Sequence, residues 1–340
     1  MAPKRSEFCC PLLKFKVVSP GWHDSGNLSF YKQRTNPTLA LIGGKEPSSR
    51  LFRLWHEPCT RDSMRWFLQL LLAGLVPIPS AAARRTLPFE MKAGLIFVAI
   101  QSPRSNVPLN FILDSGANVS ALNLATANHL GLRLPDPVPV HGVDSTVTGY
   151  WPVKMQARLG DIPLPARFLA VDLGALSTAC ATTIDGLVGA DFFHAKIVQL
   201  NFRSRTLRIL EQFKPVAAEV TLPLKQARDA ILVTVQVDGG RSQSLRLDTG
   251  CASALEWVEK GSMAAGTESG ISIGLTAIPK TTKTKNVRIG PFSFSALETG
   301  LHARPIFAGE KGLVGIGLLS RFEVVTIDCP GRRLGLQTKG

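Results

Sequence analysis

Two stretches of the chain share one order of apolar and polar positions. In residues 94–113, the apolar run "GLIFVAIQ" and the polar turn "SPRSN" precede "VPLNFIL", where Leu109, Phe111 and Leu113 alternate with other residues. In residues 229–247, "DAILVTVQV" and "DGGRSQ" precede "SLRL", where Leu245 and Leu247 alternate. Apolar residues at every second position are typical of β-strands. The pattern therefore predicts two sets of strands of the same design, one in each half of the chain.

Each set leads into the same short motif. The first ends in Asp114-Ser115-Gly116 and the second in Asp248-Thr249-Gly250, and Ser-Ala-Leu follows both, at 120–122 and 253–255. One Asp-Ser-Gly is most simply a surface turn. Two such motifs on matching predicted strands indicate an internal repeat instead.

The repeat continues downstream. The segment "DGLVGADFFHAKIVQLNFRSRTLRIL" from Asp185 corresponds to "KGLVGIGLLSRFEVVTIDCPGRRLGL" from Lys311. Gly186 lies 72 residues after Asp114, and Gly312 lies 64 residues after Asp248. The two copies therefore agree in length as well as in order.

Composition supports a mainly β chain with a sizeable core. The 340 residues are 45% hydrophobic and include 30 Gly and 23 Pro, but only 7% are aromatic, which suits many short strands joined by turns. This length favours two domains of ordinary size over one.

The formal net charge of +14 raises the question of nucleic-acid binding. Residues 84–340 hold 28 Lys and Arg against 20 Asp and Glu, and these charges are scattered. The densest basic run, "KTTKTK" at 280–285, lacks interleaved aromatic residues on which bases stack. We interpret it as a solvated loop and expect no nucleic-acid partner.

A second feature lies near residue 64. Met64 and Arg65 precede a mostly apolar run, and small residues follow at 80–83, which is typical of a secretory signal peptide over 64–83. The run is too short for a membrane-spanning helix, although a buried internal helix is an alternative. We expect an exported protein, periplasmic or extracellular, with no stable membrane insertion after cleavage, and a mis-assigned or unstructured leader at 1–63.

The cysteines do not indicate a disulfide framework or a zinc site. Three lie in the predicted leader, which leaves Cys180, Cys251 and Cys329 at irregular spacing. One pair could close in an oxidising compartment, but the sequence does not select it.

The doubled pattern, over about residues 90–340, resembles the aspartic proteases of the pepsin and retropepsin type. The resemblance implies two homologous β-barrel lobes, at 90–213 and 214–340, with the active site between them. It also implies an aspartic endopeptidase that acts on polypeptides without a cofactor or a metal, and we expect a monomer.

The same resemblance assigns roles to particular residues. Asp114 and Asp248 are the expected catalytic pair, and Ser115, Gly116, Thr249 and Gly250 are the expected support. The Ser115 and Thr249 hydroxyls are expected to hydrogen-bond to the opposite loop. The segments 187–189 and 313–315 are expected to brace the two loops.

Paired carboxylates suit peptide hydrolysis for a physical reason. Two carboxylates about 3 Å apart cannot both ionise, so one takes a proton from water while the other polarises the scissile carbonyl. The glycines allow a close approach of the loops because they lack a Cβ. A flap is expected over 140–153, where Tyr150 or Trp151 could line the substrate site, and the region 268–280 has no aromatic residue for a matching flap.

Three alternatives stay open on the sequence. Cys251 replaces the Ala of the first copy, Ala117, and is either a small buried residue or an exposed point of oxidation. The protein could bind peptides without cleaving them. Alternatively, Asp114 could pair with its counterpart in a second subunit, although a complete second motif favours a pair within one chain.

Overall fold

The computed structural model describes residues 86–141, 146–216, 219–227, 229–259, 268–271, 277–307 and 309–340, together with a short strand at Lys16–Val17. The described residues belong to one compact unit, and residues 21–80 lie outside the described residues. The predicted signal peptide at 64–83 and all but two residues of the predicted leader also lie outside them.

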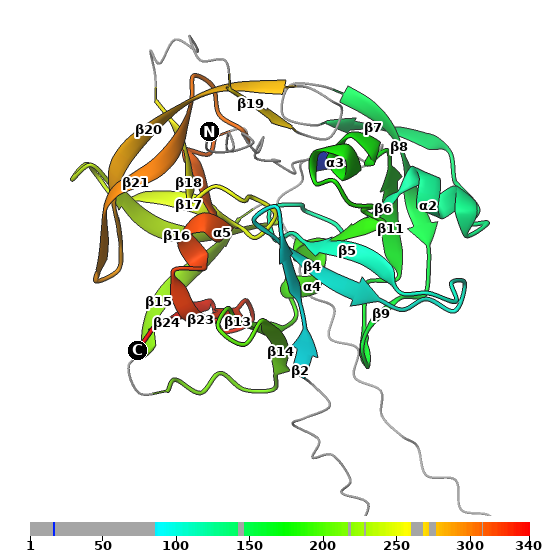
Figure 1. Cartoon of the computed structure of the whole chain (residues 1–340), viewed down its shortest axis with the longest axis horizontal. Coiled ribbons are helices and arrows are strands. Elements are labelled where there is room, and N and C mark those ends of the chain that lie inside the picture. Colours follow the sequence, from blue (N-terminus) through cyan, green and yellow to red (C-terminus); the bar gives the residue numbers. More distant parts are fainter. Residues whose placement is uncertain are drawn as a thin grey trace, which may run out of the picture. The chain divides into compact units, whose positions relative to one another are not determined.

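The first copy of the repeat builds a nine-stranded sheet (Figure 1). Its strands, in spatial order, are β1 (Lys16–Val17), β7 (Pro137–His141), β8 (Thr146–Lys154), β11 (Arg167–Val171), β6 (Ala121–Asn123), β12 (Gly186–Val188), β5 (Leu109–Leu113), β4 (Leu95–Ile100) and β3 (Glu90–Lys92). A two-stranded sheet of β9 (Arg158–Leu159) and β10 (Ile162–Pro163) accompanies it, with helices α2 (Leu124–His129), α3 (Gly174–Ala179) and α4 (Ala190–Phe193).

The second copy contributes most of a thirteen-stranded sheet. Its order is β19 (Glu268–Ile271), β20 (Ala277–Ile289), β21 (Phe292–His302), β18 (Leu255–Val258), β22 (Gly312–Gly315), β17 (Gln243–Asp248), β16 (Ala230–Val237), β15 (Glu219–Ala227), β24 (Arg333–Thr338), β23 (Phe322–Asp328), β13 (Ile197–Asn201), β14 (Thr206–Leu210) and β2 (Thr86–Pro88). Helix α5 (Ile316–Leu319) follows β22. The chain is therefore mainly β, with barrel-like sheets, as the sequence predicts.

The same strand pairing recurs in both copies. Strand β5 pairs with the preceding β4, and β17 with the preceding β16, in antiparallel fashion. Strand β12 then runs parallel to β5 and antiparallel to β6, and β22 runs parallel to β17 and antiparallel to β18. The predicted bracing segments thus lie directly beside the strands that lead into the two Asp motifs.

The strands that follow these bracing segments pair with each other. In β13 and β23, Ile197 lies opposite Asp328 and Leu200 opposite Val325, and β14 and β2 continue the sheet beyond β13. Strands from residues 86–88 and 197–210 thereby extend the sheet of the second copy. The proposed boundary between residues 213 and 214 stays a prediction.

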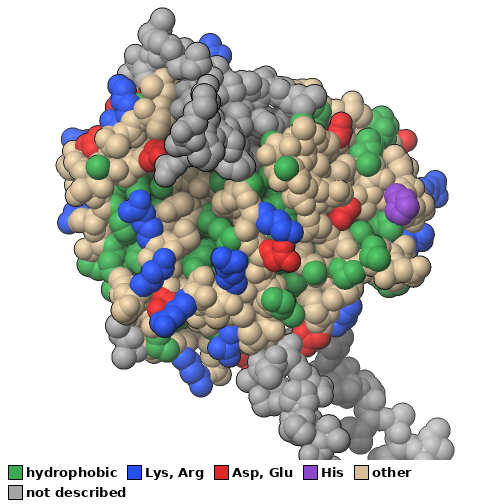
Figure 2. Space-filling model, viewed as in Figure 1, with side chains coloured by type: hydrophobic (Ala, Val, Ile, Leu, Met, Phe, Trp, Pro, Cys, Tyr) green, Lys and Arg blue, Asp and Glu red, His purple; other side chains and the backbone are tan. Residues whose placement is uncertain are grey.

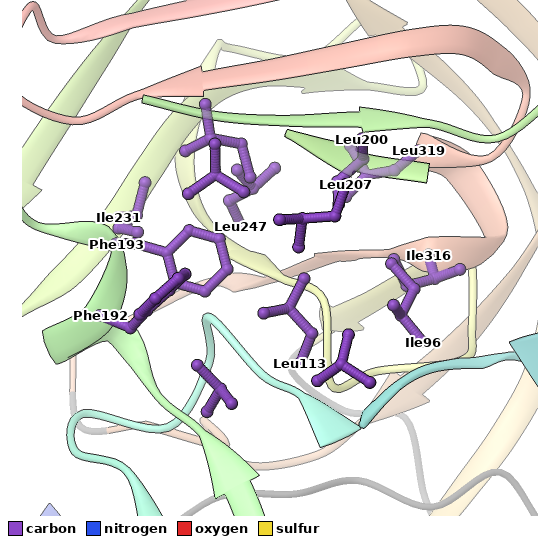
Figure 3. Close-up of a cluster of buried hydrophobic side chains, with 14 of the residues drawn as sticks. Ile96, Leu113, Phe192, Phe193, Leu200, Leu207, Ile231, Leu247, Ile316 and Leu319 are labelled. Carbon is purple, nitrogen blue, oxygen red and sulfur yellow. The ribbon is translucent and has the colours of Figure 1, made fainter. Parts of the chain in front are cut away.

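A shared apolar core holds the two copies together. The buried cluster contains residues from both halves, and Figure 3 shows Leu113 and Phe193 of the first half near Leu247 and Ile316 of the second. Burial of apolar surface is the main favourable term in folding. The ends of β5 and β17 are therefore anchored in densely packed surroundings.

The interpretation of residues 280–285 as a loop is wrong. They lie within β20, which pairs with β21. Thr is β-branched and suits a strand, and the Lys and Thr side chains tolerate a half-exposed face. Lys285 also binds Glu259 and Asp238 at 2.8 and 3.0 Å, so this lysine is neutralised locally.

Basic side chains do not gather on one face in the view drawn. Figure 2 shows Lys and Arg spread over the visible surface, with Asp and Glu among them. Within the described residues, none of the helices is long and apolar enough to cross a membrane.

Strand β1 belongs to the predicted leader yet pairs with the hairpin of β7 and β8. Lys16 lies opposite His141 and Val17 opposite Val140. This short pairing extends the edge of the nine-stranded sheet. It does not test whether residues 1–63 are a mis-assigned leader.

Candidate active site

The two Asp residues lie at corresponding ends of β5 and β17. Asp114 directly follows β5 and its backbone N–H donates to the carbonyl of Val188 in β12, at 2.9 Å. Asp248 ends β17 and lies opposite Gly315 of β22. Both Asp side chains are completely buried. The bracing strands thus hold both Asp residues in the same manner.

The glycines of the two motifs show how closely the loops approach each other. A Cβ at Gly116 would overlap the carboxylate of Asp248, and a Cβ at Gly250 would overlap the carboxylate of Asp114. Each carboxyl group therefore packs against the glycine of the opposite loop. The structure brings together the two Asp residues that the sequence singles out, although they are 134 residues apart.

A reciprocal hydrogen-bond network joins the loops. The Ser115 N–H donates to Thr249 Oγ1 at 2.9 Å, and the Thr249 N–H donates to Ser115 Oγ at 3.0 Å. The Ser115 hydroxyl then donates to the Leu247 carbonyl, and the Thr249 hydroxyl to the Leu113 carbonyl, both at 2.8 Å. These are the contacts that the resemblance implies. The network is buried and fixes both loops at once.

Backbone N–H groups hold one oxygen of each carboxyl group. Asp114 Oδ1 accepts from Gly116 at 2.9 Å and from Ala117 at 3.1 Å. Asp248 Oδ1 accepts from Gly250 at 3.0 Å. Each motif therefore folds back on its own Asp and fixes the rotation of the carboxyl group.

Burial raises the pKa of Asp114 well above its usual range, and the neighbouring charge of Asp248 raises that pKa further. The backbone N–H groups of Ala117 and Gly116 act in the opposite direction but do not cancel these effects. The pair therefore retains a proton at a pH where an exposed Asp has lost it, which is the state that acid–base hydrolysis requires.

Sequence reasoning missed a half-buried acid that supports the first loop. Asp191, in α4, accepts from the Ser120 N–H at 3.0 Å and from the Ser120 hydroxyl at 2.7 Å. The Ser120 Oγ in turn accepts from the Gly189 N–H at 3.0 Å. Burial raises the pKa of Asp191. The Ser-Ala-Leu repeat was the available signal for Ser120, but Gly317 replaces Asp191 in the second copy.

The predicted flap region forms the β7–β8 hairpin, whose tip at 142–145 lies outside the described residues. Tyr150 and Trp151 are both half-buried in β8 and pack against the buried apolar clusters. The role of either aromatic side chain toward substrate stays a prediction. In the second copy, β19 and β20 form a hairpin, and residues 272–276 between them lie outside the described residues.

Cys251 is buried at the position next to Gly250. Its backbone carbonyl accepts from the Ile316 N–H at 2.8 Å, just as the Ala117 carbonyl accepts from the Ala190 N–H at 2.7 Å. The two residues thus occupy equivalent places in the two loops. The sequence allowed either a small buried residue or an exposed point of oxidation at Cys251, and the structure confirms the buried residue.

Comparisons with known proteins found similarity to one described family and to solved structures. Residues 102–192 match the family described as aspartyl protease. The crystal structure of an aspartic proteinase from Irpex lacteus matches 75% of this chain and 97% of its own chain, with a TM-score of 0.46 and 13% sequence identity. The search of curated proteins found no match. The family match includes the first Asp motif and its bracing strand, so this part of the chain is similar to the aspartyl protease family.

Proposed function

We propose that the chain is an aspartic endopeptidase that hydrolyses peptide bonds with a water molecule activated between Asp114 and Asp248. The observation that carries this proposal is the reciprocal packing of each carboxyl group against the glycine of the opposite loop. Two buried, opposed carboxyl groups are suited to share one proton and one water molecule.

Electrostatic repulsion gives the two carboxyl groups different roles. Because two adjacent carboxylates repel each other, one member of the pair stays protonated and the other ionises. The ionised carboxylate removes a proton from water, and the protonated carboxyl group donates toward the scissile carbonyl oxygen. The raised pKa of Asp114 supports a shared proton over a pH range well above that of a free carboxyl group.

The supporting residues act by keeping this arrangement fixed. Ser115 and Thr249 tie the loops together, and Gly116 and Gly250 leave room for the carboxyl groups. Preorganised polar groups lower the barrier because they need not reorient during the reaction.

A monomer is the simplest active form. The hydrogen bonds between the loops at Ser115 and Thr249 are made within one chain, which supports an intramolecular pair. A dimer that pairs Asp114 with Asp114 of a second chain would leave Asp248 without a role.

Export is part of the proposal. The apolar run with small residues at 80–83 supports a cleaved signal peptide. Mass spectrometry of the native protein's N-terminus, in the exported and cytoplasmic fractions of its own cell, tests this. The proposal predicts a mature start near Arg84 in the exported fraction, and an uncleaved chain confined to the cytoplasm would contradict it.

Cleavage of a diverse peptide library between pH 3 and 8 tests the enzymatic proposal. The full chain should cleave peptides, and Asp114→Asn and Asp248→Asn variants should not. If a folded parent binds peptides in the library but cleaves none, the protein is a peptide-binding member of this fold and the endopeptidase proposal fails.

A further inference from the structure

Arg246 is a buried cation beside the candidate active site that has no counterpart in the first copy. It lies in β17, two residues before Asp248, and is only 3% exposed. Its Nε donates to Glu310 Oε2 at 3.0 Å and its Nη2 to Glu310 Oε1 at 2.5 Å. The guanidinium also stacks on Phe307, with its central carbon 3.6 Å from the ring centroid. One edge of the Arg246 guanidinium is therefore fixed by a bidentate ion pair with Glu310, and its face by the Phe307 ring.

The other edge of Arg246 contacts the opposite loop. Its Nη1 donates to the Gly116 carbonyl at 3.1 Å and to Asn118 Oδ1 at 3.2 Å. The Gly116 carbonyl belongs to the same peptide group as the Ala117 N–H, which donates to Asp114 Oδ1 at 3.1 Å. One peptide group thus lies between the guanidinium and the Asp114 carboxyl group. A cation on its carbonyl polarises the peptide and strengthens the hydrogen bond on its N–H side.

The first copy carries no charge at the position that corresponds to Arg246. In the first copy the residue two positions before the Asp is Ile112, which is fully buried in an apolar cluster. Buried ion pairs are often no more stabilising than apolar residues of similar size. The charge of Arg246 is therefore present in the second copy only, where the first copy has Ile112.

Among the described hydrogen bonds of Arg246, the charged partner is Glu310, and Asp248 lies two residues further along the same strand. On the neighbouring strands, Leu313 of β22 and Leu232 of β16 lie beside Arg246 and are apolar. Asn118 of the opposite loop is neutral, and Asp114 is reached through the peptide group. Glu310 binds the Nε and Nη2 edge, so the Nη1 edge remains directed at the Asp114 loop.

We propose that Arg246 is a positioning residue that makes the catalytic pair asymmetric: it favours ionisation of Asp114, so Asp114 ionises first and acts as the base, and Asp248 carries the proton. Burial still keeps the pKa of Asp114 above its ordinary value, so Arg246 only reduces that rise. This inference rests on the proposed function. Removing the cation should allow Asp114 to hold its proton to higher pH. The acidic limb of the pH–activity profile then moves to higher pH. Removing Glu310 should leave the cation less compensated and move that limb downward.

The test compares Arg246→Met, Arg246→Lys and Glu310→Gln in the full chain. For Arg246→Met we expect kcat to fall roughly tenfold to a hundredfold, with little change in KM, because the pair is less often in the state with Asp114 ionised and Asp248 protonated. Arg246→Lys keeps a charge and should restore part of kcat and of the original pH profile. If Arg246 has a purely structural role, the acidic limb of the pH–activity profile stays in place in both Arg246→Met and Glu310→Gln, or moves in the same direction in both.

Arg333→Met is the matched control. Arg333 also donates through Nε and Nη2 to a buried carboxylate, Asp328, and also lies over a ring, that of Phe213. This ion pair links the end of β23 to the start of β24. In the described interactions, Arg333 contacts neither Asp loop. Loss of this ion pair should lower stability and leave the acidic limb of the activity profile in place.

A second readout separates this inference from the protease proposal. Carbon-13 NMR of Asp carboxyl groups in the unliganded protein follows protonation of the pair directly, with Asp114→Asn and Asp248→Asn for assignment. Upward movement of the Asp114 titration in Arg246→Met, and downward movement in Glu310→Gln, would support the inference even if the parent cleaved no peptide. Unmoved titrations in both folded variants would overturn it, whatever the activity.

Discussion

Ser115 and Thr249 each accept the other's backbone N–H on a side-chain hydroxyl, at 2.9 and 3.0 Å. Each hydroxyl also donates to the carbonyl that precedes the opposite Asp, so that four buried hydrogen bonds join the two loops. The two loops therefore form one hydrogen-bonded unit rather than two separate turns.

Removal of either hydroxyl should weaken both loops. We expect Ser115→Ala and Thr249→Val each to lower the free energy of unfolding by about 1–3 kcal/mol, because each leaves a buried N–H and a carbonyl without partners. Thr249→Ser is the matched control, since Ser already performs this role in the first loop. Chemical denaturation of the singles and the double variant measures the coupling. Fully additive losses would contradict a shared network.

A side chain at either motif glycine should eliminate activity. Gly116→Ala and Gly250→Ala each direct a methyl group into the carboxyl group of the opposite loop. We expect peptide hydrolysis to fall by at least about a hundredfold as the carboxyl groups are displaced. Gly240→Ala, where the added Cβ meets only the Val237 carbonyl at 3.1 Å, is the control and should cleave at the parent rate. Near-parent activity in Gly116→Ala would contradict the close approach of the loops.

Stability should depend on pH through Asp114. Its pKa is raised above the ordinary value of 3.8, so the native state binds this proton more tightly than the unfolded chain does. Stability is therefore lost as pH rises from about 3.8 through the folded pKa. Asp114→Asn removes this loss and keeps a carbonyl oxygen for both backbone N–H groups. We expect a higher Tm than the parent at neutral pH, and a difference that shrinks toward pH 3.

Asp238→Asn should behave in the opposite way. A backbone N–H from Asn286 and the Lys285 ammonium group lower the pKa of Asp238, so its contribution is present above pH 3.8 and is lost as pH falls. This variant should be slightly less stable than the parent at neutral pH. If Asp114→Asn were instead the less stable of the two at neutral pH, the buried-pair account would be wrong.

Cys251 should be dispensable. It is buried and occupies the place that Ala117 holds in the first loop. We expect Cys251→Ala to keep activity within about threefold of the parent, since the change removes only a small, weakly polar group. Iodoacetamide should leave the folded parent active because the thiol is inaccessible. Rapid inactivation that Cys251→Ala abolishes would show that this thiol is exposed in the working enzyme.

The parts of the site that follow the repeat were predictable from the sequence. Both Asp motifs and both Gly-Leu-Val-Gly segments stand in matching order in the two copies, and the local pattern located them, whereas their bracing role followed from the resemblance. The network at Ser115 and Thr249 followed only from resemblance, because the sequence does not state which turns face each other.

Features that break the repeat were not predictable. Arg246 meets Glu310 across 64 residues and Gly116 across 130, and nothing in the local sequence selects those partners. Asp191 reaches Ser120 across 71 residues in the same way. The basic run at 280–285 looked like a loop because its polarity hides the strand preference of Thr. Tertiary contacts decided each of these cases.

The central claim is that Asp114 and Asp248 of one chain act together. The most direct measurement is the rate of peptide hydrolysis by the parent, by Asp114→Asn, by Asp248→Asn, and by an equimolar mixture of the two variants. The account predicts an active parent whose rate per chain is independent of dilution, two inactive variants, and an inactive mixture. Full activity in Asp248→Asn, or recovery of activity on mixing, would contradict a catalytic pair within one chain.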